Sequence, residues 1–544
     1  MKRVSMLFLA ICGIFIDLQG QFIREYYKSA ANATSFHAVV PISDSPTTNL
    51  YVVGNYGTQL ELSEIKQNGT VIWSRRLMVN DADYRVNAMF VDSDGNIVMT
   101  GGQSIGVDDD AYGFVAKFDP VVKNLLWFRQ VSTTVWFYDI TEGAPGGNYY
   151  ASGQEEDLGT GNQADLVVYS INRGTGAMSM ITNLNKNINE TGECIIYEPV
   201  SAGLYVAGRC ELASGSSKFR ICITKLDTLG TVEFSNYYVK STASTARMYG
   251  RDMVLDDTTI VLVGFGDDAG TSTFKNLYLL KVDLEGNILT TKEYDITTTS
   301  SDGVMASVKV HDDGYLLYGH GYTVADEDVF LFNVDKSGEV NWAYTYPYKR
   351  SVNPSGFHFV SSLAIVGPYA FHVGQRTMID GTVRGIMMRV PVSTGDAGTC
   401  EIPLSYSATS LTNFQGTSGL VNCTFTADFV SNSVLVKNMS LNTITTCSVN
   451  GKEAEDIPGL MYIQSSDDLI VYPNPASNSF TLKGDIADDE LRLVVVDING
   501  KEVYRDNNHV PGLSVDCSKW APGIYLISVS SDSGVDAASK LVID

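Results

Sequence analysis

Tyr51-Val52-Val53-Gly54, Val98-Met99-Thr100-Gly101 and Val261-Leu262-Val263-Gly264 are three of the seven short segments that decide the fold of this chain. The other four are Tyr150-Ala151-Ser152-Gly153, Tyr205-Val206-Ala207-Gly208, Leu316-Leu317-Tyr318-Gly319 and Phe371-His372-Val373-Gly374. Each ends in a glycine that follows two or three mostly apolar or small residues. Successive glycines lie 47 to 56 residues apart, which leaves room for four short strands and their turns. This period predicts an all-β fold with a seven-bladed β-propeller.

Each repeat has the internal order expected of a four-stranded blade. The second repeat has strands at 88–91, 97–101, 113–118 and 125–131, so four antiparallel strands are joined by hairpins. The second hairpin of most repeats carries a glycine in its turn, as in Asp283-Leu284-Glu285-Gly286. Three tryptophans follow this turn and are predicted to pack between neighbouring blades: Trp73, Trp127 and Trp342.

The start of the mature chain resembles the last strand of a blade. Phe22-Ile23-Arg24-Glu25-Tyr26-Tyr27-Lys28-Ser29 matches Phe234-Ser235-Asn236-Tyr237-Tyr238-Val239-Lys240-Ser241, the fourth strand of the fourth repeat. We therefore expect residues 22–28 to pair beside the strand at 385–392 and to complete blade seven. Such a closure removes exposed sheet edges at the seam of the ring.

Bulk properties restrict the possible partners. The chain has 544 residues with 62 acidic and 38 basic side chains, a net charge of −24. This charge repels nucleic-acid phosphates and anionic lipids, so no nucleic-acid partner is expected. The acidity has two interpretations, binding of a divalent cation or cationic partner and a solvated extracellular surface, and the second is favoured.

The N-terminus indicates secretion. Lys2 and Arg3 precede an apolar run at 6–16 and a small residue at Gly20, so residues 1–20 are predicted to be a signal peptide. No later stretch approaches eighteen apolar residues, so we expect no transmembrane helix in the mature chain. Disulfides are plausible in such a compartment, and Cys210 with Cys222 is the pair predicted to bridge neighbouring strands.

Beyond the repeats the pattern changes twice. Residues 21–398 are assigned to the propeller. Residues 399–468 form a Ser/Thr/Asn-rich connector that we expect to be extended or partly ordered, and an alternative is that it is laid against the propeller. In residues 469–544 the alternation of apolar and polar residues returns in seven short strands. These strands predict a small Ig-like β-sandwich.

The C-terminal module carries a family resemblance. Val471-Tyr472-Pro473-Asn474-Pro475-Ala476, the later Asn499-Gly500-Lys501 and Pro522-Gly523-Ile524-Tyr525 follow one another in the order found in type IX secretion sorting domains. The module therefore resembles a type A sorting domain. The residues that match its motifs are Pro473, Asn474, Pro475, Gly500, Lys501, Gly523, Tyr525 and Lys540.

This resemblance implies a destination and a set of partners. The chain would belong to a secreted Bacteroidetes cargo protein that reaches the periplasm by its signal peptide and crosses the outer membrane by the type IX machinery. An outer-membrane sortase would then remove the module and leave the protein released or attached to the cell surface. The resemblance says nothing of what the propeller does.

The best candidate for a ligand site is a ring of residues on the innermost strands. Aligning these strands by the glycine that follows gives one column: His37, Asn87, Phe137, Glu193, Arg251, Met305 and His358. Its polar members His37, Asn87, Glu193, Arg251 and His358 are predicted to lie at the mouth of the central channel. Two alternatives stay open: a polar channel without a ligand, and a shift by one residue to a column that contains Ala38, Ala88 and Ala306.

Other motifs give weaker signals. Gly102-Gln103-Ser104-Ile105-Gly106 has the spacing of a hydrolase nucleophile but lies between β-strands, so it is interpreted as a loop. Acidic clusters at 92–94, 108–110, 267–268 and 326–328 lack calcium-loop spacing, and no cofactor or metal is expected, with calcium the alternative. Thr228 and Thr258 follow aspartates as in Bacteroidetes O-glycosylation sites, which they resemble.

Together these features favour a secreted or cell-surface propeller that binds a protein or glycan partner without catalysis. The alternatives are an extracellular hydrolase or lyase acting on polysaccharide, and a structural component of a surface or motility apparatus. Because propellers host all three, the fold alone does not decide.

Overall fold

The computed structural model describes a chain of β-strands in two compact units, Met1–Ala454 and Glu455–Asp544. The described residues are 21–27, 34–79, 83–104, 111–157, 163–184, 189–211, 219–238, 247–267, 274–296, 303–322, 327–346, 362–377, 383–396, 402–403, 406–410, 416–417, 429–430, 434–439, 442–448, 470–472, 476–483, 491–497, 501–509, 513–530 and 536–543. The predicted signal peptide lies outside them.

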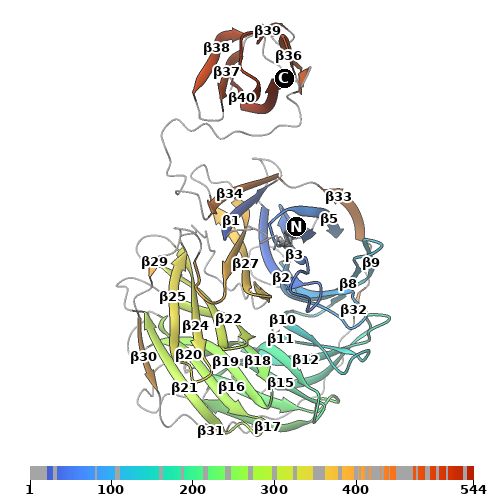
Figure 1. Ribbon diagram of the computed structural model, residues 1–544. Coiled ribbons are helices and arrows are strands. Elements are labelled where there is room, and N and C mark those ends of the chain that lie inside the picture. The colour runs from blue at the N-terminus through green and yellow to red at the C-terminus, as the bar shows by residue number, and fades with distance from the viewer. Residues whose placement is uncertain are drawn as a thin grey trace, which may run out of the picture. The chain divides into compact units, whose positions relative to one another are not determined.

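The first unit is a seven-bladed propeller, as the repeat predicts (Figure 1). The first strand of each blade contacts the first strands of the neighbouring blades, and together they form the inner ring. These inner strands are β2 (Thr34–Pro41), β6 (Asp83–Val91), β10 (Val135–Glu142), β14 (Glu190–Glu198), β18 (Met248–Asp256), β22 (Gly303–His311) and β26 (Leu363–Val366).

Three further strands pair outward from each inner strand. The second strands are β3 (Leu50–Tyr56), β7 (Ile97–Ser104), β11 (Tyr149–Asp157), β15 (Gly203–Glu211), β19 (Thr259–Asp267), β23 (Gly314–Tyr322) and β27 (Tyr369–Thr377). The third strands are β4 (Gln59–Ile65), β8 (Ala111–Asp119), β12 (Gln163–Ile171), β16 (Phe219–Leu226), β20 (Phe274–Asp283), β24 (Glu327–Asp335) and β28 (Val383–Pro391). The fourth strands are β5 (Val71–Val79), β9 (Asn124–Val131), β13 (Met178–Leu184), β17 (Val232–Tyr238), β21 (Ile288–Ile296), β25 (Val340–Tyr346) and β1 (Phe22–Tyr27).

The N-terminal strand closes the ring as predicted. β1 pairs antiparallel with β28, with Phe22 opposite Arg389 and Tyr26 opposite Gly385. The hydroxyl of Tyr26 donates to the carbonyl of Gly69 in blade one over 2.8 Å, as Tyr238 does to Gly286 over 2.9 Å between blades four and five. The similarity of the two sequences therefore reflects the same contact with the next blade.

The repeated glycine has a structural cause. In six blades the inner strand carries a β-bulge, and the glycine lies opposite the residue just before the bulged one. A Cβ on Gly54 or Gly101 would lie 1.8 Å from a carbonyl oxygen of the inner strand, and one on Gly208 would lie 2.0 Å away. Since that neighbour is backbone, only glycine allows so close an approach.

Blade contacts are apolar in the middle of each interface. Seven clusters of buried side chains each join two neighbouring blades. The predicted role of the tryptophans is confirmed: Trp73 stacks on Phe118 of the next blade at 6.0 Å, and Trp127 lies 6.4 Å from Tyr149. Trp342 donates to the carbonyl of Val392 in blade seven over 3.0 Å.

The connector contains six short strands that we call the belt. They pair antiparallel with the outer strands β25, β21, β17, β9, β5 and β1, in that order, so the chain runs backward through blades six, five, four, two, one and seven (Figure 1). The belt strands are β29 (Ile402–Pro403), β30 (Tyr406–Ser410), β31 (Gly416–Thr417), β32 (Phe429–Val430), β33 (Val434–Met439) and β34 (Asn442–Ser448). Each adds a fifth strand to a blade and covers its outer edge.

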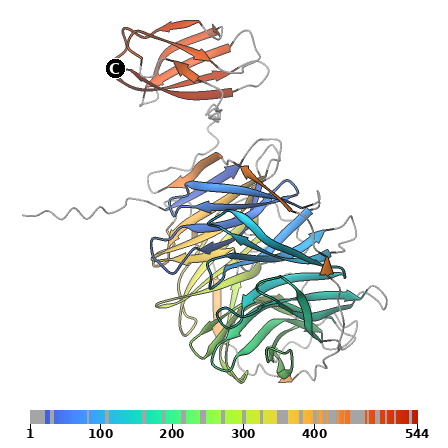
Figure 2. The same ribbon diagram turned by 90° about the vertical axis from the view of Figure 1, so that its right-hand side faces the viewer.

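The second unit is the predicted two-sheet β-module, drawn in red shades in Figure 2. Seven strands build it: β35 (Ile470–Tyr472), β36 (Ser479–Lys483) and β39 (Ser514–Asp516) in one sheet, and β38 (Glu502–His509), β37 (Leu491–Asp497), β40 (Gly523–Ser530) and β41 (Asp536–Ile543) in the other. Phe480, Leu493 and Ile527 lie in the apolar core that both sheets share.

Candidate functional site

Four of the five predicted ring residues occupy one equivalent position. His37, Asn87, Glu193 and Arg251 are the bulged residues of their inner strands, and His358 lies outside the described residues. In blades three and six the bulged residues are Tyr138 and Ala306, whereas Phe137 and Met305 of the sequence column are paired and buried in the apolar clusters. The alignment is therefore shifted by one residue in these two blades.

The ring side chains are buried, or in the case of Arg251 largely buried, and bonded to neighbouring residues. The amide of Asn87 donates to the carbonyl of Phe137 in the next blade over 2.6 Å. Arg251 pairs with Glu193 across blades four and five at 2.9 Å, and Glu193 is 1% exposed. His37 is also buried, with its Nε2 2.9 Å from the hydroxyl of Ser35. The contacts of Asn87 and Arg251 tie neighbouring blades together, whereas that of His37 lies within its own strand.

Two aspartates after the bulge extend this network, and the sequence analysis did not single them out. Asp139 accepts the backbone N–H of Ile195 in the next blade over 2.8 Å. Asp252 accepts the N–H of Val308 over 2.9 Å in the same manner. Burial, assisted by the charge of Asp252, raises the pKa of Asp139 to about 7.

A second set of contacts, which we call the ionic clasp, joins two pairs of blades. At the junction of blades two and three, Asp92 accepts from the hydroxyl of Tyr149 over 2.6 Å and pairs with Lys117 at 2.9 Å. Arg173 of blade three completes the clasp at 3.4 Å from Asp92. Although burial raises it, these donors hold the pKa of Asp92 below its ordinary value.

The same clasp joins blades five and six. Asp256 accepts from the hydroxyl of Tyr315 over 2.7 Å and pairs with Lys336 at 2.7 Å. Lys281 takes the place of Lys117 and lies 5.2 Å from the ring of Tyr315. The clasp therefore needs four groups: an aspartate, two cations and a tyrosine.

All four groups are replaced where blade six meets blade seven. The strand registers put His311 at the aspartate position and Asn333 at the position of Lys117 and Lys281. In blade seven, Ala370 stands at the tyrosine position and Val392 at that of Arg173 and Lys336. Smaller or uncharged side chains thus occupy the junction.

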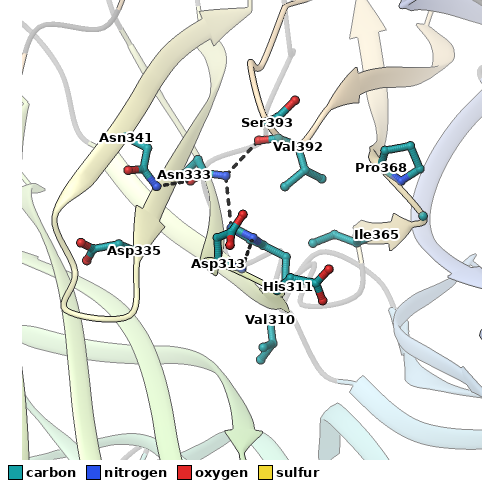
Figure 3. Close-up of a pocket in the computed structure, with 12 residues that line it drawn as sticks. Val310, His311, Asp313, Asn333, Asp335, Asn341, Ile365, Pro368, Val392 and Ser393 are labelled. Atoms are coloured by element: carbon teal, nitrogen blue, oxygen red, sulfur yellow. Dashed lines mark hydrogen bonds between the residues drawn. The ribbon is translucent and has the colours of Figure 1, made fainter.

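A groove of about 670 Å³ lies at this junction (Figure 3). Its lining residues come from the turns and strand ends of both blades: Val310, His311, Asp312, Asp313, Asn333, Asp335, Asn341, Ile365, Gly367, Pro368, Val392 and Ser393. His311 and Asn333 point toward one another in the groove (Figure 3). The sequence analysis named none of these residues as a site.

Hydrogen bonds orient the polar side chains of the groove. Asn333 donates to the carbonyl of Val392 over 2.9 Å and contacts Nε2 of His311 at 3.1 Å, while its carbonyl accepts from Asn341 over 2.8 Å. Nδ1 of the same ring faces the backbone N–H of Asp313 at 3.3 Å, so both ring nitrogens lie beside N–H donors. Burial lowers the pKa of His311, so the ring is neutral near pH 7.

The groove is acidic. Asp312 and Asp313 are exposed in the turn between β22 and β23. The carboxylate of Asp335 accepts from the hydroxyl of Ser337 over 2.7 Å and from the N–H of Glu339 over 2.9 Å, and these donors hold its pKa low. Three carboxylates thus line the groove, and the described lining residues include neither lysine nor arginine.

Other predicted sites have plain structural places. The predicted disulfide between Cys210 and Cys222 is not formed: Cys210 lies opposite Arg220 and Cys222 opposite Gly208, two residues out of register. Asp267, from one acidic cluster, pairs with Arg247 at 2.6 Å. Within the described residues, no cluster of three or more His, Cys, Asp or Glu side chains is placed to hold a metal ion.

The threonines of the predicted glycosylation sites lie in turns. Thr258 is exposed in the two-residue turn between β18 and β19, next to Asp257 with φ 54°. Thr228 is partly buried and hydrogen-bonds to Tyr150. In the part of the chain that the structure describes, no helix has the length and apolarity needed to cross a membrane.

The C-terminal module holds its motif residues in part within its core. Tyr525 is buried and donates to the carbonyl of Ala521 over 2.7 Å, and the N–H of Lys501 donates to the carboxylate of Asp497 over 3.0 Å. Gly523 begins β40, Lys540 lies in β41, and Pro473, Asn474, Pro475 and Gly500 are outside the described residues. Residues 470–544 match the profile of the family described as "Secretion system C-terminal sorting domain".

The module is a secretion-system sorting domain. This sorting domain marks the protein for export by the type IX system to the cell surface or the extracellular space. A search of curated proteins finds no match to the chain.

Solved structures give similarities to the fold. An α-L-arabinanase of Penicillium chrysogenum, complexed with arabinobiose, has a TM-score of 0.36 and 11% identity over 69% of this chain and 99% of that chain. PorZ, a surface component of the type IX secretion system of Porphyromonas gingivalis, has a TM-score of 0.28 and 9% identity, and the match covers 91% of this chain and 73% of PorZ. Drosophila Plexin A in complex with Semaphorin 1b has a TM-score of 0.38 and 7% identity, and the match covers 68% of this chain and 86% of that chain. All three TM-scores lie below 0.5, so they carry no argument about function.

Proposed function

We propose that this protein is an exported binding protein and that the groove between blades six and seven is its binding site. The observation that supports this is a cavity of about 670 Å³ at a junction that lacks all four clasp groups and whose lining carries three carboxylates. Concave sites with a few oriented polar groups are the usual places for ligands. A signal peptide at residues 1–20 and the sorting domain would bring this groove to the outside of the cell.

The lining favours a protein partner over a glycan. Sugar sites commonly offer an aromatic face for stacking, and His311 is the only ring with aromatic character among the lining residues. The apolar residues Val310, Ile365 and Pro368 lie beside the acidic ones, as in the mixed surfaces that bind peptide side chains. The ring around Glu193 and Arg251 is the less favoured site because its side chains are buried and paired between blades.

A substitution that fills the groove tests this function. Ser393 is exposed at its rim, and Ser393→Trp would place a large ring over the opening. Val121→Trp, on a residue that is 86% exposed in blade two, is the matched control. Immobilised wild type and control should retain the same surface or secreted protein, and Ser393→Trp should retain at least about tenfold less of it.

The same variants separate the alternatives. Equal retention by Ser393→Trp would contradict the groove as the site. Binding on a glycan array that Ser393→Trp abolishes would replace the protein partner by a glycan. If the wild type degrades a polysaccharide and Ser393→Trp does not, the groove is a catalytic site rather than a binding site.

A further inference from the structure

The protein itself shows which chemical group suits the clasp position. At two junctions a cation from the following blade, Arg173 or Lys336, lies beside an acidic group at the end of an inner strand. The aromatic ring of the adjacent tyrosine also faces a cation: Arg173 lies 5.6 Å from the ring of Tyr149, and Lys336 lies 4.8 Å from that of Tyr315. The place is therefore one where this fold accommodates an ammonium or guanidinium head group.

At the junction of blades six and seven this internal cation is missing from the lining. Val392 stands where Arg173 and Lys336 stand elsewhere, while Asp312, Asp313 and Asp335 supply negative charge. His311 does not compensate this charge because its ring is neutral. The groove thus combines free volume with three carboxylates and an excess of acceptor oxygens.

Resting on the proposed function, we infer that the groove accepts a lysine or arginine side chain of the protein partner. Such a side chain would enter from outside at the position that Val392 leaves uncharged. Its head group would meet the carboxylates, and its aliphatic stem would lie along Ile365 and Pro368. An anionic ligand would meet only like charge here.

The test uses peptides that differ in one charge. Immobilised pentapeptides Gly-Gly-Xaa-Gly-Gly, blocked at both ends, would carry arginine, lysine or the neutral isostere citrulline at the centre. The immobilised arginine and lysine peptides should retain the full chain at least about tenfold better than the citrulline peptide does. This difference should shrink at high salt.

Two variants change the groove and one controls for net charge. Val392→Lys supplies the internal cation found at the two clasp junctions and should weaken binding at least about tenfold. Asp312→Asn/Asp313→Asn, on two exposed residues, should weaken binding by about three- to tenfold without touching the core. Val121→Lys adds the same charge on blade two and should change binding by less than about twofold.

The outcomes distinguish the inference from the function on which it rests. Equal retention of arginine and citrulline peptides, lost in Val392→Lys, overturns the cation inference and leaves the groove as a binding site. If Val392→Lys and the double variant leave arginine binding unchanged, both the cation inference and the groove as the binding site are overturned. No retention of any peptide by the wild type overturns the inference, while Ser393→Trp still decides the function.

Discussion

Replacing Arg251 by methionine separates a structural from a ligand-binding role of the inner ring. Its guanidinium lies 2.9 Å from the carboxylate of Glu193, which is 1% exposed. Methionine keeps much of the aliphatic volume and removes the charge. Glu193 would then keep the hydroxyl of Thr191 at 3.0 Å but lose its paired cation.

The expected cost follows from the burial of that carboxylate. Removing one partner of a buried ion pair typically costs about 3–5 kcal/mol. A propeller of about 430 residues has an unfolding entropy near 0.9 kcal/mol per kelvin if it unfolds cooperatively, so Tm should fall by about 3–6 °C. The double variant Glu193→Gln/Arg251→Met removes both charges and should recover most of this loss, because a neutral pair has no charge to desolvate.

Thermal unfolding followed by circular dichroism measures both variants, and partner retention is measured on the same samples. A structural tie predicts a lower Tm for Arg251→Met, recovery in the double variant and unchanged partner binding. A Tm within about 1 °C of wild type, with partner binding lost in both variants, would refute this reasoning and restore the ring as the ligand site.

Four further predictions follow from single features. Because the folded state holds the proton on Asp139 up to a pKa of about 7, wild-type stability should fall as pH rises from about 4 to 7, and Asp139→Asn should flatten that part of the Tm profile; parallel profiles would contradict the raised pKa. Gly208→Ala, whose Cβ would lie 2.0 Å from a backbone oxygen, should lower Tm by several degrees or block folding, whereas Gly374→Ala, whose nearest neighbour among the described residues is 3.4 Å away, should be tolerated; equal effects would contradict the bulge argument. Deleting residues 402–448 should expose the outer edges of six blades and cause aggregation on size exclusion, and a monodisperse product would count against the belt as an edge cover. Mass spectrometry of protein secreted by its own host should find glycan on the exposed Thr258, and an unmodified peptide would leave it a plain turn residue.

The fold was predictable because its main signal has a local steric cause. Gly54 and Gly208 are glycines since a backbone oxygen of the inner strand lies where a Cβ would be. The same contact recurs in six blades, so the sequence shows it as a period. The seam was predictable for a similar reason, because Tyr26 and Tyr238 make the same bond to the next blade.

The inner ring was only partly predictable. The bulge inserts one residue in each inner strand, and no residue type marks its place: the bulged residues include His37, Tyr138 and Ala306. An alignment guided by residue type therefore slips by one residue in blades three and six, although the bulged residue is as far from the glycine there as in blades four and five, respectively. Whether a polar ring residue faces solvent or a neighbouring blade also depends on packing, which the alternation of a strand does not reveal.

The groove could not be predicted because it results from replaced contacts. Asp92, Lys117, Tyr149 and Arg173 are far apart in the sequence, and nothing local indicates that they meet. Only when their positions are known at the two clasp junctions does the corresponding set between blades six and seven, including His311 and its partners, become recognisable as one that lacks every clasp group.

The belt was beyond local pattern for a different reason. A strand such as β29 has two residues, too few for any alternation, and its conformation is set by the outer edge with which it pairs. The last belt strand, β34, pairs with β1 on the side away from β28, so blade seven combines three distant segments of the chain, residues 22–27, 363–391 and 442–448. Closing the ring therefore requires the strand at residues 22–27 and the segment after the seventh repeat at the same time. It follows that the folded propeller extends through residue 448, and that the chain between it and the sorting domain is much shorter than the repeats alone suggest.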